Sequence, residues 1–258
     1  MHDFSPFLLF LAALGAGIIN SVAGGGGLIA FPALLIAGVP PIYANATNKT
    51  ALWFGTFAST IAYRQELSTR KPELFLLTIA SVVGGIFGSY LLLHTPPQIF
   101  ARLIPFLMLG ATGIFTLRKL SLKIGVKRSL FELFSFNTDS RLQILIVVLL
   151  QLIVASYGGF FGGGAGILML AVLNMTGIQN IHIMNAYKCW LATCINAVAI
   201  INLALSDVIV WDRAIIMGFG ALIGGYGSAY IARKLNPIWI GYAIIGIGFS
   251  LSIYFFLK

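Results

Sequence analysis

The sequence predicts an all-α integral membrane protein built from two repeats of inverted topology. Three observations lead to this prediction: an apolar composition, a segment that occurs twice, and basic residues gathered in a few loops. Apolar residues make up 59% of the chain and charged residues 9%, with a mean hydropathy of +0.97. Soluble domains carry about 25% charged residues. A soluble fold of this size could not keep so much apolar surface from water, so we place the chain in a lipid bilayer.

The duplicated segment is the strongest signal of internal organisation. Val22–Leu52 is similar to Phe160–Leu191, and Lys49 falls on Lys188 at an offset of 139 residues (188 − 49). Each copy holds a glycine cluster, a short apolar run, a polar stretch with asparagine, and one lysine. A duplicated apolar segment interrupted by glycine is typical of transporters that bind their substrate between repeats.

The apolar runs after the glycine clusters are too short to cross a bilayer. Leu28–Gly38 and Ile167–Gly177 would each span about 16 Å as helices, roughly half of a hydrocarbon core of about 30 Å. Each glycine cluster is therefore expected to end one helix and begin a half-length one, in a hairpin that enters and leaves on one side. Backbone groups freed by such a break must face protein or a wet cavity.

Each repeat is predicted to combine this hairpin with three transmembrane helices. The first repeat covers residues 1–117 and the second 141–258, and a basic connecting loop, 118–140, separates them. The predicted apolar spans are Pro6–Ala23, Leu28–Gly38, Lys49–Tyr63, Pro72–Leu93, Gln98–Leu117, Leu142–Tyr157, Ile167–Gly177, Lys188–Leu205, Arg213–Ala232 and Pro237–Leu257.

The basic residues predict the orientation. Most of them lie in Arg64–Lys71, in the 118–140 loop with Arg141, and at 233–234. Because short cytoplasmic loops are enriched in Lys and Arg, these three loops are expected inside the cell. The loops at 94–102 and 206–213 are poor in basic residues and are expected outside. Both termini are then outside, and the two halves run in opposite directions across a cell membrane that the chain crosses many times.

The composition also bears on other classes of function. In so apolar a chain the net charge of +9 reports orientation, so we expect no nucleic-acid partner. No metal-ligand cluster, nucleophile–base pair or cofactor motif is present, and we predict no catalytic, metal or cofactor residues. All seven acidic residues fall in loops or at predicted helix ends. A path for anions therefore fits better than a path for cations, which normally needs a carboxylate within the spans.

Two features can be interpreted either as parts of a binding site or as purely structural. Lys49 and Lys188 either attract an anion or extend their ammonium groups to the headgroups, and a lysine inside the hydrocarbon costs about 2.5–3.5 kcal/mol. The clusters Gly24–Gly27 and Gly162–Gly166 either offer free N–H groups to an anion at the start of a half-helix or only permit close helix packing.

The motif order is similar to that of a known transporter family. GGGGLIAFP, the triplet Ala46-Thr47-Asn48 and a degenerate second copy resemble the sulfite exporter family, TauE/SafE. The resemblance covers essentially the whole chain. It implies a bacterial or archaeal inner-membrane transporter of small sulfur-containing anions such as sulfite, organosulfonates or thiosulfate. The second copy departs from the pattern, because Ala171 stands where Pro32 would be and Asn185-Ala186-Tyr187 replaces the triplet.

We therefore expect a carrier of a small sulfur oxyanion or organosulfonate that works by alternating access between the repeats. The alternatives are an anion channel and a membrane-embedded enzyme or assembly factor. The coupling ion, H⁺ or Na⁺, the direction of transport and the oligomeric state stay open. The predicted substrate-binding residues are Asn20, Gly24, Gly25, Gly26, Gly27, Thr47, Asn48, Lys49, Gly163, Gly164, Asn185 and Lys188.

Overall fold

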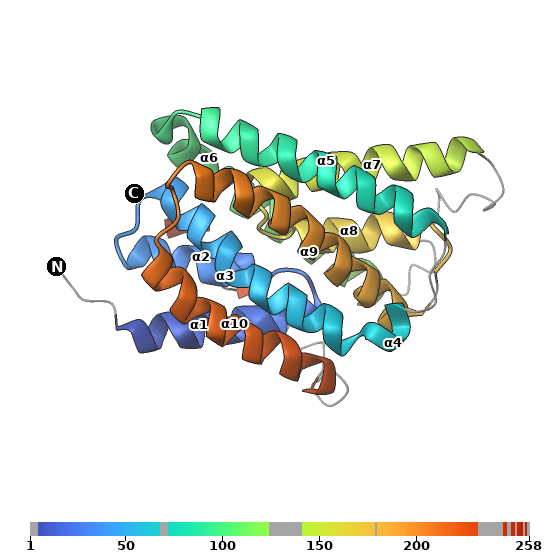
Figure 1. The fold of residues 1–258 in the computed structure, drawn as a ribbon, viewed down its shortest axis with the longest axis horizontal. Helices are drawn as coiled ribbons and strands as arrows, with labels where there is room; N and C mark the ends of the chain where they lie inside the picture. The colour runs from blue at the N-terminus through green and yellow to red at the C-terminus, as the bar shows by residue number, and fades with distance from the viewer. Residues whose placement is uncertain are drawn as a thin grey trace.

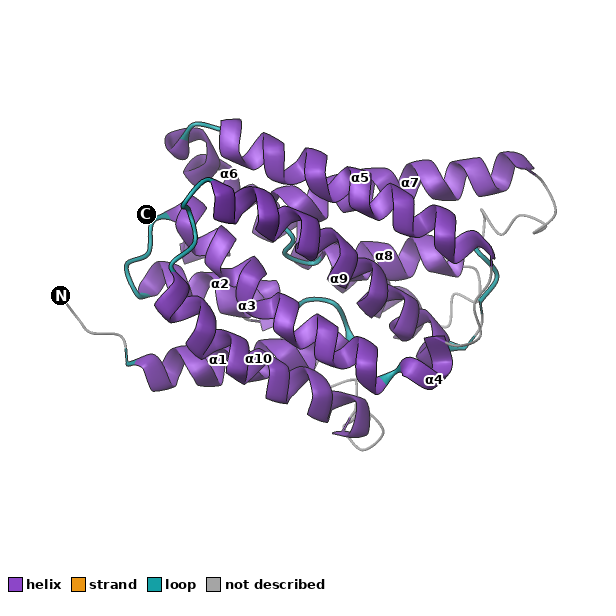
Figure 2. Ribbon diagram, viewed as in Figure 1, coloured by secondary structure: helices purple, strands orange, loops and turns teal. Residues whose placement is uncertain are grey.

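The computed structural model describes residues 5–67, 72–123, 141–178 and 180–231, together with residues 245–246, 249–250, 252–254 and 256. In these parts the chain is helical and has no strand (Figures 1 and 2). The helices lie side by side in one elongated bundle (Figure 1). Most of the predicted span Pro237–Leu257, and residues 124–140 of the connecting loop, lie outside the described residues.

The first half forms six helices: α1 (Pro6–Val22), α2 (Gly27–Ile36), α3 (Pro41–Ala62), α4 (Arg64–Leu67), α5 (Pro72–His94) and α6 (Pro97–Lys123). The described part of the second half forms four: α7 (Arg141–Phe160), α8 (Ala165–Asn174), α9 (Ile181–Leu205) and α10 (Trp211–Ile231). α6 continues through Lys123, so residues 118–123, which were predicted as the start of the connecting loop, are helical.

Both predicted helix breaks are confirmed. The chain leaves α1 after Val22 and starts α2 at Gly27, and it leaves α7 after Phe160 and starts α8 at Ala165. Figure 2 shows these breaks as short loops inside the bundle rather than at its ends. Positive φ angles at Gly24 (+82°), Gly162 (+83°) and Gly164 (+77°) turn the chain there, and only glycine adopts them without strain. The half-helices α2 and α8 have 10 residues each.

Two predicted helix starts are wrong, by about two turns. α3 begins at Pro41 rather than Lys49, and α9 begins at Ile181 rather than Lys188. Proline suits the first turn of α3 because its fixed φ is helical and its missing N–H has no partner there in any case. The asparagines that suggested a polar turn lie on the buried side of each helix, as Asn45 and Asn185 do. Both lysines therefore lie well inside their helices.

Three of the described helices are long and apolar enough to cross a bilayer by length and composition: Glu73–His94, Leu142–Phe160 and Ile181–Leu205. Shorter apolar helices are Pro6–Val22, Gly27–Ile36 and Ala165–Asn174. α3 is not among them, since it carries a row of buried polar residues that lowers its hydropathy. That row faces protein, where polar side chains find partners that lipid cannot offer.

Glycines allow the helices to touch backbone to backbone. In the stretch Val82–Tyr90 of α5, Gly84 and Gly88 face α7, and in Leu222–Tyr230 of α10, Gly224 and Gly225 face α1 and α3. A Cβ on any of these four glycines would collide with a backbone oxygen of the neighbouring helix. Small residues at these positions therefore allow close helix packing. The first helix of each half thus packs on the α5- or α10-type helix of the other half.

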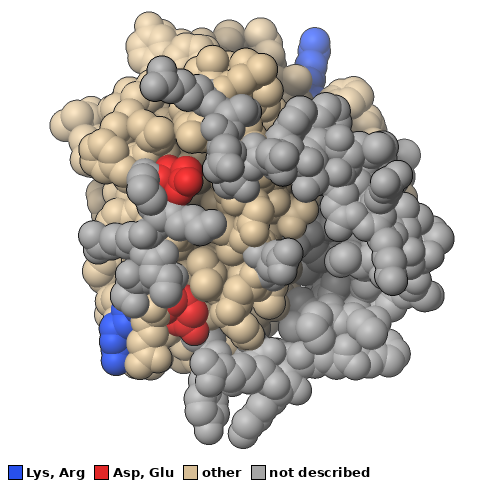
Figure 3. All heavy atoms as spheres, turned by 90° about the vertical axis from the view of Figure 1, so that its right-hand side faces the viewer, with Lys and Arg blue, Asp and Glu red and all other residues tan. Residues whose placement is uncertain are grey.

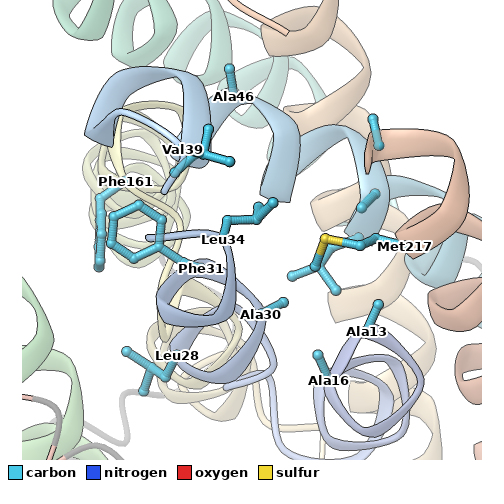
Figure 4. Close-up of a cluster of buried hydrophobic side chains, with 14 of the residues drawn as sticks. Ala13, Ala16, Leu28, Ala30, Phe31, Leu34, Val39, Ala46, Phe161 and Met217 are labelled. Carbon is cyan, nitrogen blue, oxygen red and sulfur yellow. The ribbon is translucent and has the colours of Figure 1, made fainter. Parts of the chain in front are cut away.

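The apolar core surrounds the first half-helix. Leu28, Phe31 and Leu34 of α2 are almost fully buried, with α1 on one side and α3 and α10 on the other (Figure 4). Phe31 meets Phe161, at the second break, edge to face with ring centroids 5.4 Å apart. This pair joins the two broken hairpins across the bundle. Aromatic pairs in this arrangement add about 0.5–1.5 kcal/mol beyond the area they bury.

Helices that correspond by sequence run in opposite directions. α1 and α3 run from left to right in Figure 1, whereas α7 and α9 run from right to left; α5 and α10 are likewise opposed. The loops α5–α6 and α9–α10 both lie at the left end. Figure 3 views the opposite end, where the described surface shows isolated charged side chains among neutral ones.

We predict that Gly17→Ala destabilises the protein, although alanine is the better helix former. A Cβ at Gly17 would lie 2.5 Å from the Ala221 carbonyl oxygen on α10, and such overpacking costs about 1–3 kcal/mol. Gly15→Ala, on the same helix, is the matched control, because nothing lies within 4 Å of its added Cβ. Thermal unfolding in detergent should show a lower midpoint for Gly17→Ala and an equal or higher one for Gly15→Ala. Equal shifts would contradict the close contact of α1 with α10.

Candidate functional site

The two breaks enclose a small cavity with polar and apolar walls. Its volume is about 40 Å³, enough for ordered water or a small solute group. α3 and α9 supply most of the rest of the wall. The lining residues are Asn20, Gly27, Asn48, Lys49, Leu52, Thr56, Gly158, Phe161, Gly162, Ala165, Gly166, Met169, Lys188, Cys189, Ala192, Ile195 and Asn196.

Lys188 of α9 binds the carbonyl end of α1. Its Nζ donates to the carbonyl oxygens of Asn20 at 2.9 Å and Ser21 at 2.6 Å, and to Oδ1 of Asn185 at 3.2 Å. The residue is only 2% exposed. The last four carbonyls of a helix lack partners within the helix, and a cation stabilises that negative end. Lys188 thus holds the end of a helix that belongs to the other half of the chain.

Lys49 of α3 has the reciprocal position at the second break. It is 3% exposed, and its Nζ donates to the carbonyl oxygen of Gly158, in the last turn of α7. Asn45, one turn earlier on α3, donates from Nδ2 to the Phe160 carbonyl oxygen at 2.8 Å. The Tyr157 hydroxyl donates to the Gly163 carbonyl oxygen at 2.6 Å. Three side chains therefore fix the second break. The headgroup interpretation of Lys49 and Lys188 is wrong in this structure, since both ammonium groups bind carbonyls inside the bundle.

The charges around the cavity favour a negative guest. The lysines bind the carbonyl ends of α1 and α7, while the amide ends of α2 and α8 start at the same two breaks. At these starts the amides of Leu28, Ala165 and Ile167 already donate to carbonyl oxygens of the breaks. The helix starts therefore act mainly through their partial positive charge. None of the residues that line the cavity is acidic. Among the described residues, Glu66, Glu73, Asp207 and Asp212 all lie in loops or near helix starts.

The structure brings some of the predicted binding residues together and gives others a different environment. Five line the cavity: Asn20, Gly27, Asn48, Lys49 and Lys188. Thr47 does not, because its hydroxyl accepts a hydrogen bond from the Val210 amide at 3.0 Å. Asn185 lies beside the cavity as an acceptor for Lys188. Direct roles for these residues in binding stay predictions.

The other predicted glycines serve close packing at the breaks. A Cβ at Gly24 would lie 2.5 Å from the backbone of Gly166, so the two hairpins touch here without side chains. Gly26 packs as tightly against the Ala16 carbonyl oxygen. Close packing is therefore one role of these glycines, and their role in binding an anion stays a prediction. Gly25, Gly163 and Gly164 also lie in the breaks, outside the cavity wall.

Several residues of the site were not predicted. Gly158, Phe161, Met169 and Cys189 line the cavity. The sequence held a signal for them, since they lie close to the second glycine cluster or to Lys188. Asn45 and Tyr157 were missed as well. The partner of Asn45 is a backbone carbonyl far away in the chain, whereas Tyr157 binds the carbonyl of the nearby Gly163. A bond to a backbone carbonyl leaves no trace in the sequence.

A helical membrane protein with two glycine-broken hairpins meeting at a polar cavity has the architecture of a transporter. A family model described as sulfite exporter TauE/SafE matches residues 9–255. Because this match covers nearly the whole chain, the protein belongs to the TauE/SafE family of membrane transporters. The resemblance predicted from the motifs is confirmed.

Curated relatives support the same class. The chain is 29% identical to a probable membrane transporter protein, ORF9, of Sinorhizobium sp, over 91% of this chain and 87% of the relative. It is 29% identical to a probable membrane transporter protein of Haemophilus influenzae, over 95% and 92%. The probable membrane transporter protein YfcA of Escherichia coli is also 29% identical, over 89% and 83%. No solved structure matches.

We predict that Gly162→Ala disturbs Lys49. Its Cβ would lie 3.0 Å from Lys49 Nζ and 3.1 Å from the Gly158 carbonyl oxygen, at a φ of +83°. Gly38→Ala is the matched control, because Gly38 has a φ of +80° with nothing within 4 Å of the added Cβ. The left-handed backbone costs both variants about 1–2 kcal/mol. Thermal unfolding should therefore show a larger loss for Gly162→Ala. Equal losses would mean that the lysine adjusts freely.

Proposed function

We propose that this protein transports a small sulfur-containing anion, of the sulfite, organosulfonate or thiosulfate class, and binds it in the cavity between the two breaks. One observation carries the proposal: two buried lysines line a single cavity that has no carboxylate in its wall. A buried charge is stabilised by an opposite charge, and the ammonium groups meet neutral oxygens at the breaks, so the site is suited to an anion. Membership of the sulfite exporter family supports the proposed class of anion.

The binding chemistry follows from the donors at the cavity. Lys49 and Lys188 provide charge, and Asn20 and Asn48 add amide groups. The first amides of α2 and α8 point from the helix starts toward the breaks and add the positive ends of two helix dipoles. Asn48 is 3% exposed and its Oδ1 has no partner, so its side chain can turn toward a guest without losing a bond from that oxygen. Phe161, Met169 and Ile195 give the cavity an apolar wall for the uncharged part of the anion.

The transport mechanism in this proposal is alternating access between two inverted repeats. Three observations support it: corresponding helices run in opposite directions (Figure 1), the first helix of each half packs on the other half, and each half supplies a lysine to the other half's break. The cavity lies where the halves meet. Movement of one half against the other would expose it first to one side and then to the other.

The orientation in the proposal is that of a multi-pass protein of a bacterial or archaeal inner membrane with both termini outside. The two loops poor in basic residues, at 94–102 and 206–213, lie at one end of the bundle, as does the start of α1 (Figure 1). Arg64, after α3, lies at the opposite end (Figure 1). This distribution agrees with the enrichment of Lys and Arg in cytoplasmic loops.

Purified protein in liposomes should take up or release labelled sulfite, thiosulfate or a sulfonate, with a flux that saturates. Lys49→Ala should weaken anion binding by about 10- to 100-fold, because a buried charge-assisted hydrogen bond contributes about 1.5–3 kcal/mol. Lys123→Ala, at the end of α6, is the control and should leave binding unchanged. Equal effects of the two substitutions would show that Lys49 has no special role. A flux that rises linearly with concentration would indicate a channel instead of a carrier.

Cysteine labelling tests the orientation. In a background with Cys189 and Cys194 replaced by serine, Gln98→Cys should react with an impermeant maleimide added to intact cells. Arg64→Cys should react only after the membrane is opened. Both positions are exposed and flank the same long helix, α5, so each is the other's control. The reverse pattern would place the termini inside, and labelling of both in intact cells would contradict a spanning α5.

A further inference from the structure

The carbonyl end of α1 has the ligand set of a cation site, and the carbonyl end of α7 offers one oxygen of the same kind. At the first break, the carbonyl oxygens of Asn20 and Ser21 and Oδ1 of Asn185 converge on one point. At the second break, the Gly158 carbonyl oxygen points to the corresponding place. Transporters with interrupted helices use such C-terminal carbonyls to coordinate Na⁺. Here the position at each break is occupied by the ammonium group of a lysine.

We propose that Lys188 and Lys49 are built-in cations that take the place of Na⁺ at the two breaks. An ammonium group has one positive charge, as Na⁺ does, and each lysine belongs to the third helix of the opposite half. The charge that neutralises the helix ends is therefore attached to the protein and does not move with the solute. Of the two candidate coupling ions, Na⁺ then has no role at these carbonyls.

Burial and reciprocity support this assignment. Lys49 is 3% exposed and Lys188 2%, so bulk water does not reach the carbonyl ends that they contact. In the hydrogen bonds of the breaks, both ammonium groups donate to carbonyl or amide oxygens. The Asn20 oxygen also accepts from the Gly24 amide. A carbonyl that lacks a donor inside a membrane protein is costly, and the lysines add donors at both helix ends. Removing a lysine should thus leave a vacant site with oxygen ligands, which a small free cation can fill.

The first test measures stability and needs no substrate. Thermal unfolding of the full chain in detergent is followed in NaCl, choline chloride and methylammonium chloride at equal ionic strength. The wild type should have the same midpoint in all three salts. Lys188→Ala should have a lower midpoint that rises in methylammonium chloride or NaCl but not in choline chloride, because a cation that binds only the folded state stabilises it. Lys123→Ala is the control and should behave as the wild type.

Lys49→Ala tests the other break and keeps the proposal open to refutation if Lys188→Ala does not fold. A sodium-specific rise in the wild-type midpoint would overturn the proposal, and so would variants of both lysines whose midpoints ignore the added cation. The second test measures anion flux in liposomes and rests on the proposed function. Wild-type flux should persist when Na⁺ is replaced by choline, and flux of Lys188→Ala should fall severalfold and recover in part with methylammonium. Absence of any flux in the wild type would count against the proposed function, while the stability test would still decide on the built-in cations.

Discussion

The structure depends on one constraint: a helix that ends inside a membrane protein exposes carbonyl groups that neither lipid nor bulk water can satisfy. α1 and α7 both end this way, and in each case a lysine from the other half of the chain donates hydrogen bonds to these carbonyls. Lys188 donates hydrogen bonds to two carbonyl oxygens of α1. Lys49 donates to one carbonyl oxygen of α7, and Asn45 donates to a second. These contacts stabilise both breaks, join the two halves and place two lysines at the centre of the bundle.

The same contacts decide the sign of the field in the cavity. At each break the negative end of one helix adjoins the positive start of the next, and the two partial charges of about half a unit would nearly cancel. An ammonium group bound to the carbonyl end shifts the balance to positive. The lysines therefore act on a guest in two ways, through their own charge and through the helix ends that they mask. An arginine would not replace Lys49 equally well. Its planar guanidinium group needs a larger and differently shaped space than the one beside Gly162.

The sequence was enough to predict a helical membrane protein, the two breaks and the correspondence of Lys49 with Lys188, because glycine clusters and buried charges are rare and leave strong patterns. It was not enough to predict that α3 starts at Pro41. The asparagines after that proline suit a turn as well as a buried helix face, and only the tertiary partners distinguish the two. The partners of the lysines were also beyond prediction. The carboxylate partner of a lysine can be sought among the few acidic residues of the sequence. A backbone carbonyl partner can belong to any residue of the chain.

The two breaks are related but not equivalent, and the difference has a physical consequence. Asn45 and Tyr157 fix the second break, and the residues that match them at the offset of 139 are Met184 and Ile18, which offer no hydrogen bond. In the described part of the chain, Lys188 supplies the side-chain hydrogen bonds to the carbonyls of the first break, and close packing adds to them. Gly24 and Gly166 touch through bare backbone, so the cavity cannot widen there unless the hairpins part as units. In the proposed mechanism the α7–α8 hairpin then serves as the fixed wall, and the contact that must change is the one between Lys188 and the end of α1.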